Sequence, residues 1–177
     1  FYFNKILELH PEEHQYILKI GDEYANEFDY SKAEEYYLKY KSLYPKSPES
    51  YLKMGWIDYD KNEYNRALEY FQQAKILGAS GSEIDLFIGN SLSRIENWST
   101  EQYATYFMER INDYINEDGM NEGAVDIYNN ILEYFEKRGE FSKAIPYLEK
   151  ALEHVLKNQL EGFYYLKHIH YLNHYAE

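Results

Sequence analysis

Cysteine is absent from this sequence of 177 residues, which excludes disulfides, thiolate metal ligands and a cysteine nucleophile. Positive charge is scarce, because 18 Lys and Arg stand against 31 Asp and Glu for a net charge of −13. An acidic chain without a Lys/Arg cluster repels phosphate backbones, so we expect no nucleic-acid ligand. No stretch approaches the ~18 apolar residues of a membrane span, so we also expect no membrane insertion.

The start of the chain gives limited information about the compartment. No signal peptide is visible, and this favours a cytoplasmic location. The chain begins at Phe1 and not at Met, however, so it is consistent with a fragment or a processed form. The sequence therefore leaves the location and the pathway open.

What the sequence does contain is an internal repeat of 34 residues. Glycines in similar contexts recur at this interval, and so do the alanine and the aromatic residue that follow them. Between these markers, apolar residues lie at helical spacing, which predicts pairs of amphipathic helices joined by short turns. The recurring residues are Gly21, Gly55 and Gly89, then Ala33 and Ala67, then Tyr37 and Phe71.

This pattern resembles the tetratricopeptide repeat, in which an aromatic, Leu-Gly, Tyr, Ala, an aromatic and Pro recur at fixed offsets. The resemblance implies an all-α fold, a right-handed superhelical solenoid of helix-turn-helix repeats. In the first full repeat, the motif positions fall on Ile17, Ile20-Gly21, Tyr24, Ala33, Tyr37 and Pro45. Small residues such as Gly21 and Ala33 let two helices approach closely, and aromatics such as Tyr24 and Tyr37 fill the remaining space.

The repeat divides the whole chain, 1–177, into a single solenoid. Residues 1–13 match the end of a preceding repeat, and 159–177 read as an extra or capping helix. Asp58 stands in the second repeat where the motif expects tyrosine. The predicted repeats are 14–47, 48–81, an irregular 82–124, and 125–158.

The third repeat is irregular because Ala144 follows Ala67 by 77 residues, which is nine more than two periods. We place the extra residues around Asn97-Trp98 and around 117–123. Ala104 and Met108 are the expected markers of this repeat, and Ser99 with Gln102 predicts a capping box. Pro146 is expected early in the last helix pair's second helix, where a missing N–H has the smallest cost.

In tetratricopeptide arrays the first helix of each pair lines the concave face, so the resemblance implies a partner-binding groove there. One stripe of each first helix packs inward, and the stripe beside it should face the groove. Trp56 and Tyr59 are the aromatic anchors that interfaces favour. The leucines of the stripe have an alternative role, which is to pack adjacent helices against each other. The predicted groove residues are Leu18, Asp22, Leu52, Trp56, Tyr59, Leu86, Asn90 and Glu133.

The charge of this stripe predicts the chemistry of the ligand. Some tetratricopeptide domains hold a peptide's C-terminal carboxylate with lysines and asparagines. Here Asp22, Glu133 and Glu136 occupy comparable positions, which argues against a carboxylate clamp. We therefore expect a protein or peptide partner that is apolar with basic flanks, with self-association through open solenoid ends as a further option.

Metal sites and catalysis are not predicted. Asp58, Asp60, Asn62 and Glu69 match parts of a calcium-loop pattern, but Glu63 stands where that loop requires glycine. His170 and His174 have metal-ligand spacing but no evident third ligand. No phosphate-binding glycine loop or nucleophile elbow appears, so we expect no cofactor and no enzyme activity.

The leading hypothesis is a scaffold or adaptor that holds a partner's peptide or helix in a concave groove. One alternative is the peptide-sensing module of a larger regulator, and another is a substrate-binding array attached to an enzyme. A third is a secretion-type chaperone, which small acidic repeat proteins resemble. The full-length sequence would separate these alternatives, but the sequence does not identify the partner or the oligomeric state.

Overall fold

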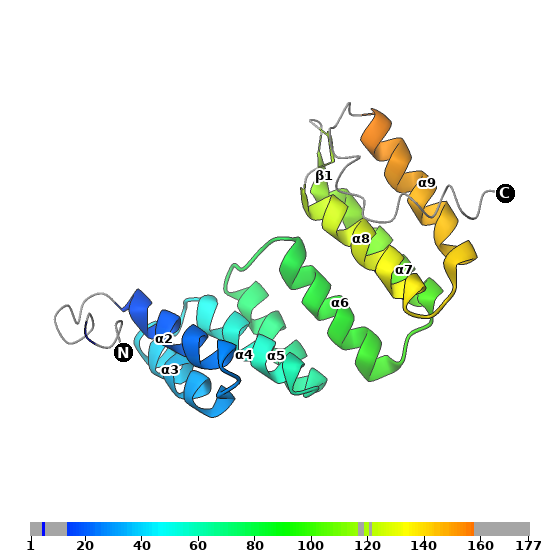
Figure 1. The fold of residues 1–177 in the computed structure, drawn as a ribbon. Coiled ribbons are helices and arrows are strands. Elements are labelled where there is room, and N and C mark those ends of the chain that lie inside the picture. The colour runs from blue at the N-terminus through cyan, green and yellow to red at the C-terminus, as the bar shows by residue number, and fades with distance from the viewer. Residues whose placement is uncertain (1–4, 6–13, 117–118, 121, 158–177) are drawn as a thin grey trace. The chain divides into compact units, whose positions relative to one another are not determined.

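The computed structural model describes residue 5 and residues 14–116, 119–120 and 122–157. Within these residues the chain is almost entirely helical, and its one sheet is a two-stranded hairpin (Figure 1). The α-helices are α2 (Gln15–Asn26), α3 (Tyr30–Leu43), α4 (Glu49–Asp60), α5 (Tyr64–Ile76), α6 (Ser82–Glu96), α7 (Thr100–Arg110), α8 (Glu122–Glu136) and α9 (Phe141–Lys157). None of the described helices is both long and apolar enough to cross a membrane.

The helices form two compact units, Phe1–Ser80 and Gly81–Glu177, and each is described by itself. We call them unit 1 and unit 2. In unit 1, α2 packs on α3, α3 on α4 and α4 on α5, so the two helix pairs lie in sequence order (Figure 1). Its core contains Ala33, Tyr37, Met54 and Ile57, all of them buried.

One contact recurs in every helix pair that contains a motif glycine. A Cβ added to Gly21 or Gly55 would lie closer than 3.0 Å to the ring of Tyr37 or Phe71 on the second helix. Both rings are buried, so any side chain larger than hydrogen would have to displace a packed aromatic. This confirms the expectation that the small residue and the aromatic together allow the helices to approach.

The turns inside the helix pairs also repeat. Phe28, Asn62 and Gly139 each precede the motif alanine by five residues, and each adopts a left-handed conformation with φ between 60° and 68°. The next residue's N–H donates to the carbonyl of the residue five positions earlier, as in Glu63 to Asp58 at 2.8 Å. These bonds satisfy carbonyls that the end of a helix leaves without partners.

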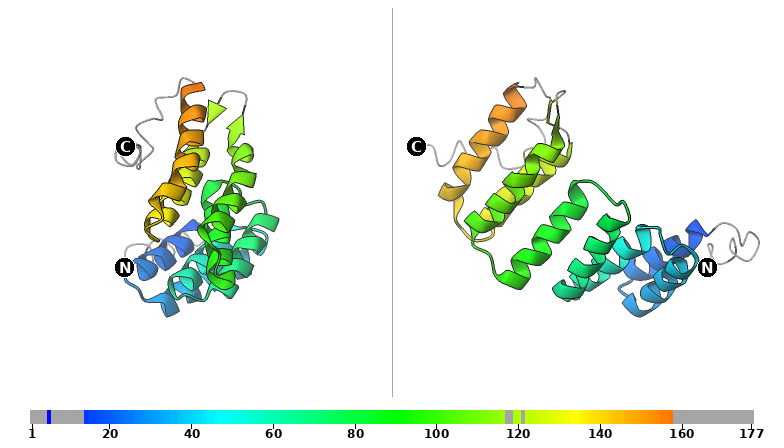
Figure 2. Two further views of the ribbon diagram at one scale, coloured as in Figure 1. Left: turned by 90° about the vertical axis from the view of Figure 1, so that its right-hand side faces the viewer. Right: turned by 180° about the vertical axis from the view of Figure 1, so that it is seen from behind.

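Unit 2 departs from the 34-residue period in two places. Asn97 ends α6 in a left-handed conformation, and the chain reaches α7 only at Thr100. After α7, a short 3₁₀ helix (Ile111–Tyr114) leads into β1 (Ile115–Asn116), which pairs antiparallel with β2 (Gly119–Met120). The hairpin lies beside α9 (Figure 2). These segments hold extra residues close to the positions that the period predicted.

The marker residues of the third repeat differ from the prediction. Gly89 faces the buried ring of Phe107, whereas Met108 is only half-buried. Phe107 follows Gly89 by 18 residues, while the equivalent interval in unit 1 is 16, and it follows Ala104 by three residues, whereas Tyr37 follows Ala33 by four. The choice of Met108 was therefore wrong, because it assumed the unit 1 spacing from Ala104.

The position of Pro146 also needs a correction. Helix α9 begins at Phe141, which makes Pro146 its sixth residue. The first four N–H groups of a helix have no intrahelical partner, and Pro146 lies beyond them. Its missing N–H therefore removes a helical hydrogen bond, and the cost is larger than the sequence suggested.

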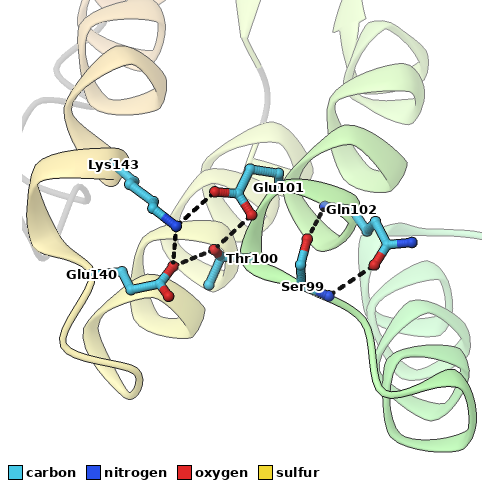
Figure 3. A network of polar contacts seen from close by, with 6 residues as sticks. All are labelled: Ser99, Thr100, Glu101, Gln102, Glu140 and Lys143. Atoms are coloured by element: carbon cyan, nitrogen blue, oxygen red, sulfur yellow. Dashed lines mark hydrogen bonds and ion pairs between the residues drawn. The ribbon is translucent and has the colours of Figure 1, made fainter.

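Polar side chains connect the third and fourth repeats inside unit 2 (Figure 3). Ser99 and Gln102 form the predicted capping box at the start of α7. The buried Thr100 hydroxyl lies within hydrogen-bonding distance of Glu101 and Glu140. Lys143 bridges the same two carboxylates at 2.8 and 3.1 Å. The network joins the start of α7 to the start of α9.

Candidate partner-binding hollow

Unit 1 contains a hollow of about 320 Å³ between the first helices of its two repeats. Helix α2 contributes Asp22, Ala25 and Asn26, and α4 contributes Lys53, Trp56, Ile57 and Asp60. The second helix α3 closes it with Tyr30 and Tyr37. We call this feature the α2–α4 hollow.

Helical spacing explains why these side chains meet. On α2, residues 22, 25 and 26 lie three and four positions apart and therefore share one face. On α4, Lys53 is one turn before Trp56, and Asp60 is one turn after it. Stacking of successive first helices places the two faces against each other.

The inner end of the hollow is organised around Asp22. Its carboxylate accepts a hydrogen bond from the Tyr37 hydroxyl at 2.7 Å and forms an ion pair with the Lys53 ammonium at 3.0 Å. Burial, together with the Asp22 carboxylate, raises the pKa of Tyr37, so this hydroxyl remains a donor. The Lys53 ammonium also lies 4.7 Å from the centroid of the Trp56 ring. This distance is that of a cation–π contact.

The outer end is formed by Asp60 and Tyr30. The Tyr30 hydroxyl donates to the Asp60 carboxylate at 3.3 Å, and Asp60 is exposed. Desolvation and the neighbouring carboxylate raise the pKa of Tyr30. With two carboxylates and one ammonium among its lining side chains, the hollow carries a net charge of −1. It combines an aromatic wall with an excess of hydrogen-bond acceptors.

Asp58 does not belong to this hollow, although it lies between two of the lining residues in sequence. Its side chain is buried and forms an ion pair with Arg66 of α5 at 3.3 Å. Burial raises the pKa of Asp58, and Arg66 opposes this shift. At the position where the motif expects tyrosine, the chain therefore places a buried charge that links α4 to α5.

Asp58 and Asp60 have different environments, since the first is buried and the second is exposed. The calcium-loop pattern thus does not bring its first two carboxylates into one solvent-facing set. Over the described ranges, no group of three or more His, Cys, Asp or Glu side chains could hold a metal ion. His170 and His174 lie outside these ranges.

The predicted groove residues of unit 1 fall into two sets. Asp22 and Trp56 line the α2–α4 hollow, whereas Leu18, Leu52 and Tyr59 do not. Leu18 packs against the core of unit 1, as expected if the leucines of the stripe pack adjacent helices together. The Tyr59 ring lies 5.3 Å from the Tyr64 ring, near the turn into α5. The stripe of α4 that faces the hollow is therefore displaced by one residue from the predicted stripe.

The predicted residues of unit 2 have separate environments. Leu86 packs against the core of that unit. The side-chain oxygen of Asn90 accepts a hydrogen bond from Tyr103, and Glu133 forms an exposed ion pair with Lys137 at 2.9 Å. The partner-binding role of all eight predicted residues remains a prediction.

Sequence reasoning missed Lys53, Asp60 and Tyr30. The first two carried a usable signal, since they lie three residues before and four residues after Trp56 on the same helix face. Tyr30 comes from a second helix, and no pattern along the chain links it to Trp56. Only the packing of the helix pairs brings it to the hollow.

A model of the tetratricopeptide repeat family matches residues 14–47, 48–75 and 125–153, which together make up slightly more than half of the chain. The chain belongs to the tetratricopeptide repeat family. The described residues form an all-α array of its helix-turn-helix repeats, apart from the small hairpin. Tetratricopeptide repeat proteins generally mediate protein–protein interactions. The chain matches no curated protein sequence at a significant level.

Solved structures with the tetratricopeptide fold resemble this chain. A crystal structure of MamA is 22% identical with a TM-score of 0.60, and the match covers 89% of this chain and 86% of MamA. YrrB, described as a tetratricopeptide protein with an unusual peptide-binding site, is 16% identical with a TM-score of 0.61, covering 86% and 74%. MamA residues 41 to the end from Desulfovibrio magneticus RS-1 are 12% identical with a TM-score of 0.61, covering 90% and 85%. At these identities the likeness shows the fold.

Proposed function

We propose that this chain is a scaffold or adaptor that holds a segment of a partner protein in the α2–α4 hollow. The observation that carries the proposal is the half-buried Trp56, which forms one wall of an open hollow beside charged side chains. A large ring that is partly accessible and surrounded by polar groups is the usual anchor of a protein interface.

The chemistry of the hollow supports a partner segment with apolar anchors and basic flanks. The partly exposed Trp56 and Ala25 side chains offer apolar surface, and the acidic excess favours cations. Apolar contacts should supply most of the affinity, while the net charge of −13 on the chain should mainly raise the association rate. We expect the chain to act without enzymatic turnover or a cofactor. A peptide-sensing regulatory module or a secretion-type chaperone would use the same surface.

The test begins with a displayed random-peptide library selected on the whole chain, because such a library supplies ligands whatever the natural partner is. Trp56→Ala should weaken binding of the selected peptides by roughly 2 kcal/mol, or about 30-fold. Isothermal titration calorimetry would measure the affinities, and circular dichroism melting would show that the fold is retained.

Tyr59→Ala is the matched control. Tyr59 lies on the same helix as Trp56 but outside the hollow, so its replacement should leave peptide affinity nearly unchanged. If Trp56→Ala leaves binding intact in a folded protein, the hollow is not the binding site. If Tyr59→Ala has the larger effect, the predicted stripe through Leu52 and Tyr59 is the binding surface, and the assignment to this hollow is wrong.

A further inference from the structure

The α2–α4 hollow already contains a cation, the ammonium of Lys53. This ammonium lies 3.0 Å from an Asp22 carboxylate oxygen and 4.7 Å from the Trp56 ring centroid. A carboxylate and an aromatic face at such distances are the two elements from which proteins build sites for cationic side chains. Lys53 thus marks the position where a cation is stabilised in the hollow.

Lys53 can leave this position. Its side chain is 25% exposed, and a partly exposed ion pair of this kind contributes little net stability because water competes for both groups. Asp22 would not be left without a donor, because the Tyr37 hydroxyl still donates to it at 2.7 Å. The Lys53 contact is therefore a weak, reversible cover over the Asp22 and Trp56 surfaces.

The hollow also has acceptor capacity that Lys53 does not use. The described hydrogen bond to Asp60 comes from Tyr30 at 3.3 Å, which leaves carboxylate lone pairs at the exposed end of the hollow. A guanidinium carries five donors in a planar fork and can also lie flat on an indole ring, whereas an ammonium is a compact point charge. The hollow thus suits arginine better than a second lysine.

We propose that the α2–α4 hollow binds one arginine side chain of the partner. The guanidinium of this arginine replaces the Lys53 ammonium beside Asp22 and Trp56, and Asp60 accepts a hydrogen bond from its outer edge. The inference rests on the proposed function and names the group recognised at that site. Lys53 then acts as an internal competitor. A ligand cation displaces it only when further contacts, such as those to Asp60 and the apolar wall, add to its affinity.

If Lys53 competes with the ligand, removal of its charge should strengthen arginine binding. Lys53→Met keeps the aliphatic stem but removes the competing ammonium, so it should tighten arginine binding by about three- to tenfold. Asp22→Asn and Asp60→Asn should each weaken it by about tenfold, since each removes one charged acceptor. Asn at position 22 still accepts from Tyr37, so that variant should fold.

Lys41→Met is the matched control. The Lys41 ammonium lies 4.4 Å from the Tyr51 ring centroid, so it also makes a cation–π contact in unit 1, but it does not line the hollow. Its replacement changes the net charge of the chain by the same amount as Lys53→Met. A general electrostatic effect would therefore appear in both variants, and the proposed competition only in Lys53→Met.

The probes are N-acetyl-arginine amide and its uncharged counterpart N-acetyl-citrulline amide, titrated into the whole chain and followed by NMR. The arginine probe should shift the Trp56 indole N–H signal, more tightly in Lys53→Met than in the wild type or in Lys41→Met. The citrulline probe should not shift it. Equal binding of both probes, or an unchanged or weaker affinity in Lys53→Met, would overturn the inference.

The library peptides separate this inference from the proposed function. Peptides that depend on Trp56 but bind equally well after their arginines are replaced by citrulline would support the partner-binding function and refute arginine recognition. An arginine probe that binds at Trp56 while no peptide is selected would support the cation site and refute the partner-binding function.

Discussion

In both units, the helix pairs that contain a motif glycine share the same central contact, but the two units support it differently. In unit 1, Gly21 with Tyr37 and Gly55 with Phe71 repeat at a fixed interval of 34 residues. In unit 2, Gly89 faces Phe107 after a longer interval, and polar side chains surround the site where the period breaks. A lengthened turn loses the standard register, and specific hydrogen bonds and ion pairs then fix the position of the next helix.

Tyr103 shows this difference most clearly. Its buried ring stacks on Tyr134 with 3.6 Å between centroids, and its hydroxyl lies between the side chains of Asn90 and Asn130. In unit 1 a buried tyrosine at a different position of the repeat, Tyr37, makes its polar contact with Asp22, which also faces the hollow. In unit 1 the polar end of a core tyrosine thus belongs to the candidate binding site. In unit 2 it joins three helices.

The largest effect should come from removing a core ring in unit 1. Tyr37→Ala should destabilise the fold by about 3–5 kcal/mol, because it leaves a cavity beside Gly21. Tyr37→Phe keeps the ring and should cost only about 1 kcal/mol for the lost hydrogen bond to Asp22. Urea unfolding followed by circular dichroism measures both. Similar losses in the two variants would show that packing of the ring is not what holds α2 on α3.

The next effect tests whether the glycine contact is equivalent in the two units. Gly55→Ala and Gly89→Ala should each cost about 1–3 kcal/mol, since the new methyl group would overlap a buried ring. Residue-resolved NMR during urea unfolding would locate each loss in its own unit. If only one variant is destabilised, the aromatic in the other unit can move, and the shared contact is not a general rule of this chain.

The helix-pair cores were largely predictable from the sequence, because the 34-residue period specified which residues pack. Gly21, Ala33 and Tyr37 were correctly placed in the core, and Ser99 with Gln102 was correctly predicted to form a capping box. Met108 was misplaced because the ring that meets Gly89 follows Ala104 by three residues, whereas Tyr37 follows Ala33 by four.

The hollow was only partly predictable for a different reason. Trp56 and Asp22 were identified from helix-face position, and Asp60 could have been found in the same way. Tyr30 and the pairing of Lys53 with Asp22 depend on contacts between separate helices. Spacing along one helix does not contain that information.

Opposite pH responses should distinguish the units further. Burial raises the pKa of Asp58 in unit 1 above its ordinary value of 3.8. A hydrogen bond from Lys143, with help from the backbone and Ser99, lowers the pKa of Glu101 in unit 2 to about 2. The Asp58 contribution to stability is therefore present below pH 3.8 and lost as the pH rises through the raised value. The Glu101 contribution is present above its ordinary value of 4.5 and lost as the pH falls toward 2.

Acidification from pH 4.5 toward 3 should accordingly weaken the contact between α7 and α9 in unit 2, while in unit 1 it relieves the cost of burying the Asp58 carboxylate. Urea titrations at several pH values, followed by residue-resolved NMR, would show this. Lys143→Met should flatten the response of unit 2, and Asp58→Asn that of unit 1. Parallel loss in both units, unchanged by either variant, would contradict the assigned causes.

The smallest expected effect is a gain in stability. Phe28 adopts φ of 60° with 77% of its surface exposed, whereas the equivalent turn residues are Asn62 and Gly139. A left-handed conformation is unfavourable for phenylalanine and better tolerated by asparagine. Phe28→Asn should therefore stabilise unit 1 by about 0.5–1 kcal/mol in urea unfolding. A loss of stability would mean that the Phe28 ring contact with Tyr30, at 6.1 Å, outweighs the backbone strain.

The position of a bound partner segment, which we propose to lie in the α2–α4 hollow of unit 1, can be measured directly. A nitroxide spin label attached to a library-selected peptide would broaden the NMR signals of nearby residues in the bound complex. We predict the strongest broadening at Asn26, Lys53, Trp56 and Asp60, which line the hollow. Broadening centred on α5 or on unit 2, with the signals of these four residues preserved, would show that the peptide binds elsewhere.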